Sequence, residues 1–140
     1  MTLEVGPTTD LVACLELRRV VFMIEQSVSE ADERDGKDDV AHHILAQDKG
    51  VPVGCARILI DGSTGKIGRV CVLKDRRGTG LGQALIDACL AHLSTIPNVT
   101  RAALGAQTNA LGFYEKLGFV AFGPEFLDAN IPHRMMERAL

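Results

Sequence analysis

One glycine-rich turn constrains the fold of this chain more than any other feature. Residues 68–83 run from an apolar strand through a basic turn, Arg76-Arg77-Gly78-Thr79-Gly80-Leu81-Gly82, into a helix. A helix that begins at such a turn presents free backbone N–H groups and the positive end of its dipole, and both attract phosphate. Glycines let a phosphate approach the backbone closely. The sequence therefore predicts a phosphate-bearing ligand at residues 77–82.

Two common nucleotide-binding motifs do not fit this turn. A Walker A loop needs Gly-Lys followed by Ser or Thr, whereas Gln83 follows Gly82 here. A Rossmann fingerprint needs glycine at position 83 and an acidic residue at the end of the next strand, which here ends in Gln107. The remaining alternative is that the glycines only shape a tight turn. Alternating glycines behind a pair of arginines favour the phosphate site over that alternative.

The rest of the chain reads as strands that alternate with helices. Thr9 or Asp10 can cap the first helix, and Asp48-Lys49-Gly50 reads as a hairpin turn. Residues 27–39 carry six acidic side chains and are predicted to form a solvated loop with at most one helical turn. The predicted strands span 3–5, 42–47, 51–60, 67–73, 101–107, 119–122 and 131–140, and the predicted helices span 10–24, 81–93 and 110–117. This order predicts an α/β fold, a mixed sheet flanked by helices.

Composition excludes several classes of protein. The 140 residues fit one domain, and an apolar fraction of 46% can supply its core. A net charge of −3 argues against a nucleic-acid partner. No apolar run approaches the roughly 20 residues that cross a bilayer, and the N-terminus lacks the pattern of a signal peptide. We therefore expect a cytoplasmic protein that binds neither nucleic acid nor membrane.

The four cysteines are expected to be reduced core residues. Cys14, Cys55, Cys71 and Cys89 share no CxxC spacing, and each has apolar neighbours. That pattern is typical of cysteines that act as small hydrophobes. We therefore predict neither a metal site nor a redox centre.

Two segments resemble the GNAT family of N-acetyltransferases. Arg77-x-x-Gly80-x-Gly82 is similar to the family's acyl-CoA pyrophosphate signature, and residues 109–119 are similar to its Asn…Phe/Tyr-Tyr-x-x-x-Gly-Phe segment. Residues 21–26, 42–43, 68–70 and 131–135 resemble the ElaA/YjcF-like branch, so the likeness covers nearly the whole chain.

The resemblance implies a fold and an activity. The expected fold is a single GNAT domain over residues 1–140, with a mixed, splayed β-sheet flanked by helices. The expected activity is transfer of acetyl from acetyl-CoA to the amine of a small molecule, by direct attack in a ternary complex. The alternatives are acetylation of a protein amine and an acyl-CoA-binding sensor without catalysis. A homodimer is possible.

The resemblance also implies a set of residues that contact CoA. The turn amides would bind the pyrophosphate, and the strand before the turn would bind the pantetheine arm. Asn109 would also contact that arm. The expected CoA-binding residues are Val70, Cys71, Val72, Arg77, Gly78, Thr79, Gly80, Leu81, Gly82, Gln83 and Asn109.

Tyr114 and His133 are the predicted catalytic residues. Tyr114 would protonate the departing thiolate, and its alternative role is packing. His133 would accept a proton from the attacking amine, because a neutral imidazole is a suitable base near pH 7; its alternative role is a structural hydrogen bond. Adjacent His42 and His43 should face opposite sides of a strand, and His92 should lie on a helix surface.

The acceptor side is less well specified. Arg69 could clamp an acidic group on the substrate, and Glu25 could act as the base through a water molecule. Arg18 and Arg19 are expected to form surface ion pairs. The acidic segment 30–39 could attract a cationic acceptor, although we favour a solvated loop. A ping-pong route through Cys71 is disfavoured, because a buried apolar cysteine is a poor nucleophile.

Overall fold

The computed structural model describes residues 2–140 and contains one seven-stranded sheet. The sheet order is β1-β2-β3-β4-β5-β7-β6, and β4 with β5 is its parallel pair. The strands are β1 (Leu3–Thr8), β2 (His42–Asp48), β3 (Val51–Asp61), β4 (Thr64–Val72), β5 (Arg101–Gln107), β6 (Val120–Asp128) and β7 (Ile131–Ala139). The mixed sheet and the predicted order of strands and longer helices are confirmed.

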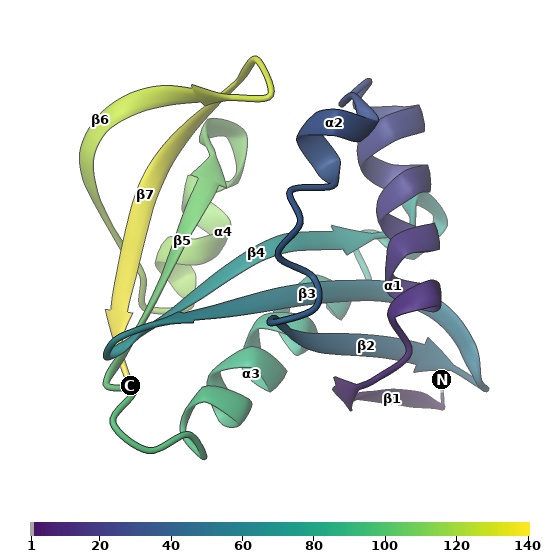
Figure 1. The fold of residues 1–140 in the computed structure, drawn as a ribbon, viewed down its shortest axis with the longest axis horizontal. Helices are drawn as coiled ribbons and strands as arrows, with labels where there is room; N and C mark the ends of the chain where they lie inside the picture. The colour runs from purple at the N-terminus through teal and green to yellow at the C-terminus, as the bar shows by residue number, and fades with distance from the viewer. Residues whose placement is uncertain (1) are drawn as a thin grey trace.

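Helices cover both faces of this sheet (Figure 1). Asp10 caps α1 by accepting from the N–H of Ala13, and the helix then continues with π-helical geometry through η1. The helices are α1 (Leu11–Arg18), η1 (Arg19–Glu25), α2 (Glu30–Glu33), η2 (Lys74–Arg76), α3 (Leu81–Leu93), η3 (Thr108–Ala110) and α4 (Leu111–Lys116). None of the helices in residues 2–140 is long and apolar enough to cross a membrane.

Side chains of β2 point alternately to the two faces of the sheet, and each face has its own hydrophobic cluster. Ile44 and Ala46 pack in one cluster with Leu85 and Leu93 of α3, whereas Leu45 packs in the other with Leu17 of α1. Successive side chains of a strand point to opposite faces, so a single strand serves both layers.

Two details of the first strands bear on the sequence predictions. The hairpin turn is confirmed, with Lys49 and Gly50 both at positive φ (51° and 79°), as a two-residue hairpin turn of type I′ requires. The first strand, however, runs through Gly6-Pro7 to Thr8, longer than predicted. Pro7 is tolerated because β1 is an edge strand, where a missing N–H costs no ladder bond.

The two central strands part halfway along their length. β4 and β5 are paired only from Thr64↔Arg101 to Ile67↔Leu104, after which they diverge. Figure 1 shows the resulting V: β5 and β7 lie on one side below the turn between β6 and β7, and β4 runs away from them on the other side, with α2 above it. The splayed sheet that the resemblance implied is confirmed.

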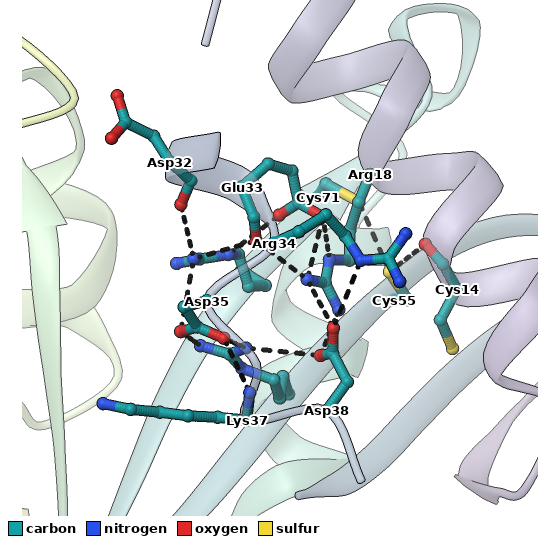
Figure 2. A network of polar contacts seen from close by, with 12 residues as sticks. Cys14, Arg18, Asp32, Glu33, Arg34, Asp35, Lys37, Asp38, Cys55 and Cys71 are labelled. Carbon is teal, nitrogen blue, oxygen red and sulfur yellow. Dashed lines mark hydrogen bonds and ion pairs between the residues drawn. The ribbon is translucent and has the colours of Figure 1, made fainter. Parts of the chain in front are cut away.

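The acidic segment is exposed along most of its length, as predicted, but two of its carboxylates are withdrawn from solvent, which the prediction missed. One helical turn is present (α2), but the side chain of Glu33 is only 2% exposed and that of Asp38 is 10% exposed. Arg18, expected at the surface, is 1% exposed and pairs with both carboxylates. Figure 2 shows these side chains converging beneath the segment. Arg19 does lie at the surface, where it pairs with Glu16.

Candidate active site

Among residues 2–140, the first amides of α3 have no hydrogen-bond partner where the glycine turn opens the helix. The first α-helical bond runs from the N–H of Ala84 to the carbonyl of Gly80, and the N-cap has no side chain to accept from the helix. The N–H groups of Leu81, Gly82 and Gln83 precede that bond, so they are free for a ligand. Gly80 has φ of 86°, in the left-handed region that favours glycine, and a Cβ there would meet open space.

The arginines of the turn are engaged with acidic residues. Arg76 pairs with Asp48 of β2. Arg77 forms a two-point ion pair with Glu25 at the end of η1, with Nη2 2.9 Å from Oε1, and also donates to the carbonyl of Val72. Arg77 therefore ties the turn to η1 and β4, and the backbone amides remain the groups open to a phosphate.

A cavity of about 330 Å³ lies in the V between β4 and β5. Its walls come from η1 and the segment after it, α2, β4, β5, η3, α4, the β6–β7 turn and the start of β7. The lining residues are Phe22, Gln26, Val28, Asp32, Glu33, Ile67, Gly68, Arg69, Val70, Leu104, Gly105, Gln107, Ala110, Tyr114, Asp128, Ala129, Ile131 and His133. Both predicted catalytic side chains thus line a single cavity.

His133 is held in one tautomer. It lies on β7 opposite Gln107 of β5, and its ring stacks on Phe126 with centroids 5.8 Å apart. Its Nδ1 lies 2.6 Å from the carbonyl oxygen of Ile131. A carbonyl only accepts, so Nδ1 carries the proton and the neutral ring keeps a lone pair on Nε2. The arrangement suits a base, although His133 is a buried side chain at 8% exposure.

Tyr114 sits half-buried on α4, packed edge-on against Phe113 and Phe119. Burial raises the pKa of its hydroxyl to about 12, with a smaller contribution from Cys89. The group therefore stays protonated, and able to donate, throughout the neutral range.

Comparison with known proteins is consistent with this geometry. Residues 15–140 match the family model described as an acetyltransferase (GNAT) domain. The chain belongs to the GNAT family. Its likeness to the ElaA/YjcF-like branch is confirmed by 38% identity to the uncharacterized N-acetyltransferase YjcF of Bacillus subtilis, covering 86% of each chain.

Solved structures agree with this assignment to the GNAT family. An acyl-CoA N-acyltransferase from Pseudomonas aeruginosa is 33% identical with a TM-score of 0.85, covering 98% of each chain. ElaA of Escherichia coli is 30% identical, also with a TM-score of 0.85, covering 99% of each chain. The chain is thus an N-acetyltransferase of the GNAT fold, a family that uses acyl-CoA and acts on amines.

The predicted acceptor residues of this GNAT enzyme are already paired. Arg69 lines the cavity, but its Nε donates to Glu33 and its Nη2 donates to backbone carbonyls of α2. Glu25 lies at the ion pair with Arg77, outside the cavity lining. The hydrogen bond from Arg77 lowers the pKa of the Glu25 carboxyl, which makes it a weaker base.

The remaining histidines have partners elsewhere. His42 Nδ1 lies 2.9 Å from His92 Nε2 on α3, and His43 Nε2 lies 2.9 Å from the Asp38 carbonyl oxygen. The predicted opposite orientation of His42 and His43 is confirmed. His92 is half-buried rather than a surface residue, and burial followed by the neighbouring His42 lowers its pKa.

All four cysteines are free and buried, as predicted. Cys71 lies beneath α1, with its Sγ 3.4 Å from that of Cys55. It is absent from the cavity lining, whereas its neighbour Val70 is part of that lining. Residues 2–140 contain no group of three or more His, Cys, Asp or Glu placed to hold a metal ion.

Sequence reasoning missed several residues of the cavity wall. Gln26 and Gln107 approach each other across the cavity at 3.2 Å, and Asp32 and Asp128 stand on its two sides. These positions are far apart in the sequence and belong to no local motif. Gln26 lies within the segment 21–26 that resembles the family branch, which was the one available signal.

Proposed function

We propose that this chain transfers acetyl from acetyl-CoA to the amine of a small molecule, within one domain spanning residues 1–140. The observation that carries the proposal is the free amide cluster at the start of α3, next to a cavity between splayed strands. The amides of residues 81–83, with the turn Arg77–Gly80, would bind the pyrophosphate. Val70, Cys71, Val72 and Asn109 would guide the pantetheine arm through their backbone or side chain.

The cavity residues supply the proton transfers of a direct reaction. The amine nitrogen attacks the thioester carbon, a C–N bond forms, and the C–S bond breaks with its electrons leaving on sulfur. Nε2 of His133 accepts the proton that the amine loses, and the Tyr114 hydroxyl donates a proton to the thiolate. No metal is needed for these steps.

The charges around the cavity favour a neutral or cationic acceptor. Arg69 is paired with Glu33 and Asp35, so its positive charge is offset. Asp32 and Asp128 line the cavity as exposed carboxylates, and no ion pair is formed by either one among the described residues. The cavity volume of about 330 Å³ suits a small molecule better than a protein segment.

A panel of small amines and amino acids, assayed for CoA release from acetyl-CoA, tests the proposal. We expect CoA and acetylated amine in equal amounts for at least one member. Release without an acetylated amine would show thioester hydrolysis and contradict the proposal, whereas binding without release for every amine would favour the sensor. Mass spectrometry of the protein with acetyl-CoA alone should show no adduct, and an acetyl group on Cys71 that an amine removes would establish ping-pong transfer instead.

A further inference from the structure

The strand that borders the cavity is irregular where it passes the cavity. On β3 the partners Cys55 and Arg57 are two residues apart, but on β4 their partners Cys71 and Gly68 are three apart. Arg69 and Val70 therefore stand opposite Ala56 alone, which is a β-bulge in β4. A bulge takes backbone groups out of the regular ladder, and residues 68–70 all line the cavity.

The bulge needs an external restraint. Arg69 has φ of 51°, in the left-handed region that is strained for a residue with a side chain. Such conformations persist only when the surrounding structure holds them. Val70 on one side of Arg69 packs against the core, whereas Gly68 on the other side has open space where a Cβ would be, so packing restrains the bulge on one side only.

The Arg69 side chain supplies the restraint. Its Nε lies 2.9 Å from Oε2 of Glu33, and its Nη2 lies 3.2 Å from the carbonyl oxygens of Asp32 and Glu33. Glu33 is in turn fixed by Arg18, whose Nε donates to Oε1 at 2.8 Å. The bulge is thereby tied through α2 to α1, and Figure 2 shows Glu33 lying against Arg18.

We infer that Arg69 and Glu33 are positioning residues whose ion pair fixes the backbone of the β4 bulge against the thioester. The inference rests on the proposed function, because it assigns the bulge a place beside the reacting carbonyl. A bulge amide held there can stabilise the developing oxyanion only if it does not move. Arg69 thus acts on the reaction through the backbone rather than by binding the acceptor.

Arg69→Gly is the informative variant, because glycine keeps the positive φ without strain while removing the side chain that contacts Glu33, Asp35 and the α2 carbonyls. We expect kcat to fall about 10–100-fold, with acetyl-CoA Kd and acceptor KM within about twofold of wild type. Arg69→Lys, which can still pair with Glu33, should recover most of the loss. A rise in acceptor KM with kcat intact would show that Arg69 binds the acceptor and would overturn the inference, as would an unchanged kcat.

Glu33→Gln provides an independent variant in case Arg69→Gly is unstable. It should reduce kcat similarly, and the double variant Arg69→Gly/Glu33→Gln should lose little more kcat than either single one, because both changes break the Arg69–Glu33 contact. Glu33→Gln also weakens the buried pair with Arg18, so kcat is compared at a temperature where circular dichroism shows every variant folded. Additive losses would contradict a shared role. Arg19→Ala, which breaks the surface pair with Glu16, is the matched control and should leave kcat unchanged.

Hydrogen exchange separates this inference from the proposed function. Amides of residues 68–72 should exchange faster in Arg69→Gly than in wild type, while those of β2 do not change. Equal protection at 68–72 in the two proteins would overturn the inference, whether or not any amine is acetylated. If the wild-type enzyme releases no CoA with any amine while Arg69→Gly still exchanges faster at residues 68–72, the proposed function is refuted. The role of the Arg69–Glu33 ion pair in holding the bulge is then still supported.

Discussion

At the scale of single residues, the cavity combines a hydroxyl that keeps its proton with an imidazole that has a free lone pair. Burial raises the pKa of Tyr114 to about 12. The Ile131 carbonyl fixes the proton of His133 on Nδ1. The two side chains come from different elements, α4 and β7, and both line the cavity. The environment thus prepares one group to donate and the other to accept.

Replacing Tyr114 by Phe should lower turnover far more than it lowers CoA affinity. The hydroxyl is needed only as the thiolate forms, and loss of a general acid typically costs about 10²–10⁴-fold in rate. Steady-state kinetics together with calorimetry on acetyl-CoA would measure both quantities. Because the ring still packs against Phe119, stability should change little. Equal kcat values for the two proteins would reduce Tyr114 to a packing role.

His133→Asn tests the proposed base. Asn can still donate to the Ile131 carbonyl but cannot take a proton at neutral pH. In wild type an imidazole base must be neutral, so kcat/KM should fall as the pH is lowered. We expect the Asn variant to lose that acidic limb and most of the rate, with acetyl-CoA affinity retained. Near-normal turnover with the wild-type pH profile would leave His133 a structural role.

At the scale of elements, α2 is held on the sheet by arginines from three directions. Arg18 comes from α1, Arg57 from β3 and Arg69 from β4, and together they meet Glu33, Asp35 and Asp38. Removing one partner from a buried pair leaves an uncompensated charge, which is strongly destabilising. The acidic segment is thus a fixed wall of the cavity.

This network should make stability depend on acid pH. Two carboxyl groups of this network have lowered pKa values. For Asp35 the main cause is hydrogen bonding to Arg57. For Asp38, desolvation raises the pKa, but the interactions with Arg18 and Arg57 lower it by more. A carboxyl with a lowered folded-state pKa stabilises the fold above its unfolded pKa, about 3.9 for Asp, and this stabilisation is lost as the pH falls toward the folded value. Urea unfolding between pH 7 and pH 3 should show falling stability.

Asp35→Asn provides the matched comparison. Its free energy of unfolding should be lower than wild type at pH 7, and the gap should narrow as the pH approaches 3, because the unfolded wild-type chain then binds a proton at Asp35 that the folded protein does not. Glu125→Gln, at an exposed position, is the control and should track wild type. A gap between Asp35→Asn and wild type that stays constant with pH would contradict the ion-pair explanation.

The sequence predicted those parts of the fold that depend on local patterns. The strand–turn–helix at 68–83, the hairpin at Lys49-Gly50 and the Asp10 cap each depend on neighbouring residues, and each was found. The withdrawn carboxylates of the acidic segment were missed because their partners lie on other elements. Six acidic residues in one short segment are typical of a solvated loop. The sequence alone does not show that the fold places Arg18 and Arg57 against Asp38 and Asp35.

The candidate site was predictable to a similar extent. Tyr114 and His133 were found through the family resemblance, and the structure brings both to one cavity. The pairing of Arg77 with Glu25 joins residues that are 52 positions apart, and no local sequence pattern predicts it. The β4 bulge likewise follows from a register shift against β3, which single-strand periodicity cannot reveal.

At the scale of the whole molecule, the sheet supplies the cleft by opening between β4 and β5. The turn that ends β4 begins α3, so the amide cluster and the cavity are joined by one strand. An extended ligand that is anionic at one end and acylated at the other matches this layout. The central claim is therefore that acetyl-CoA binds with its pyrophosphate on the turn at residues 77–83.

Calorimetry with acetyl-CoA on wild type, Gly80→Ala and Gly80→Glu tests that claim most directly. Both substitutions strain the backbone at φ of 86°, by about 1–2 kcal/mol. Only Gly80→Glu adds a negative charge at the turn, and this charge should repel the pyrophosphate of acetyl-CoA. With folding checked by circular dichroism, we expect binding by wild type, weakened binding by Gly80→Ala and none by Gly80→Glu. A folded Gly80→Glu protein that binds acetyl-CoA as tightly as wild type would contradict the account.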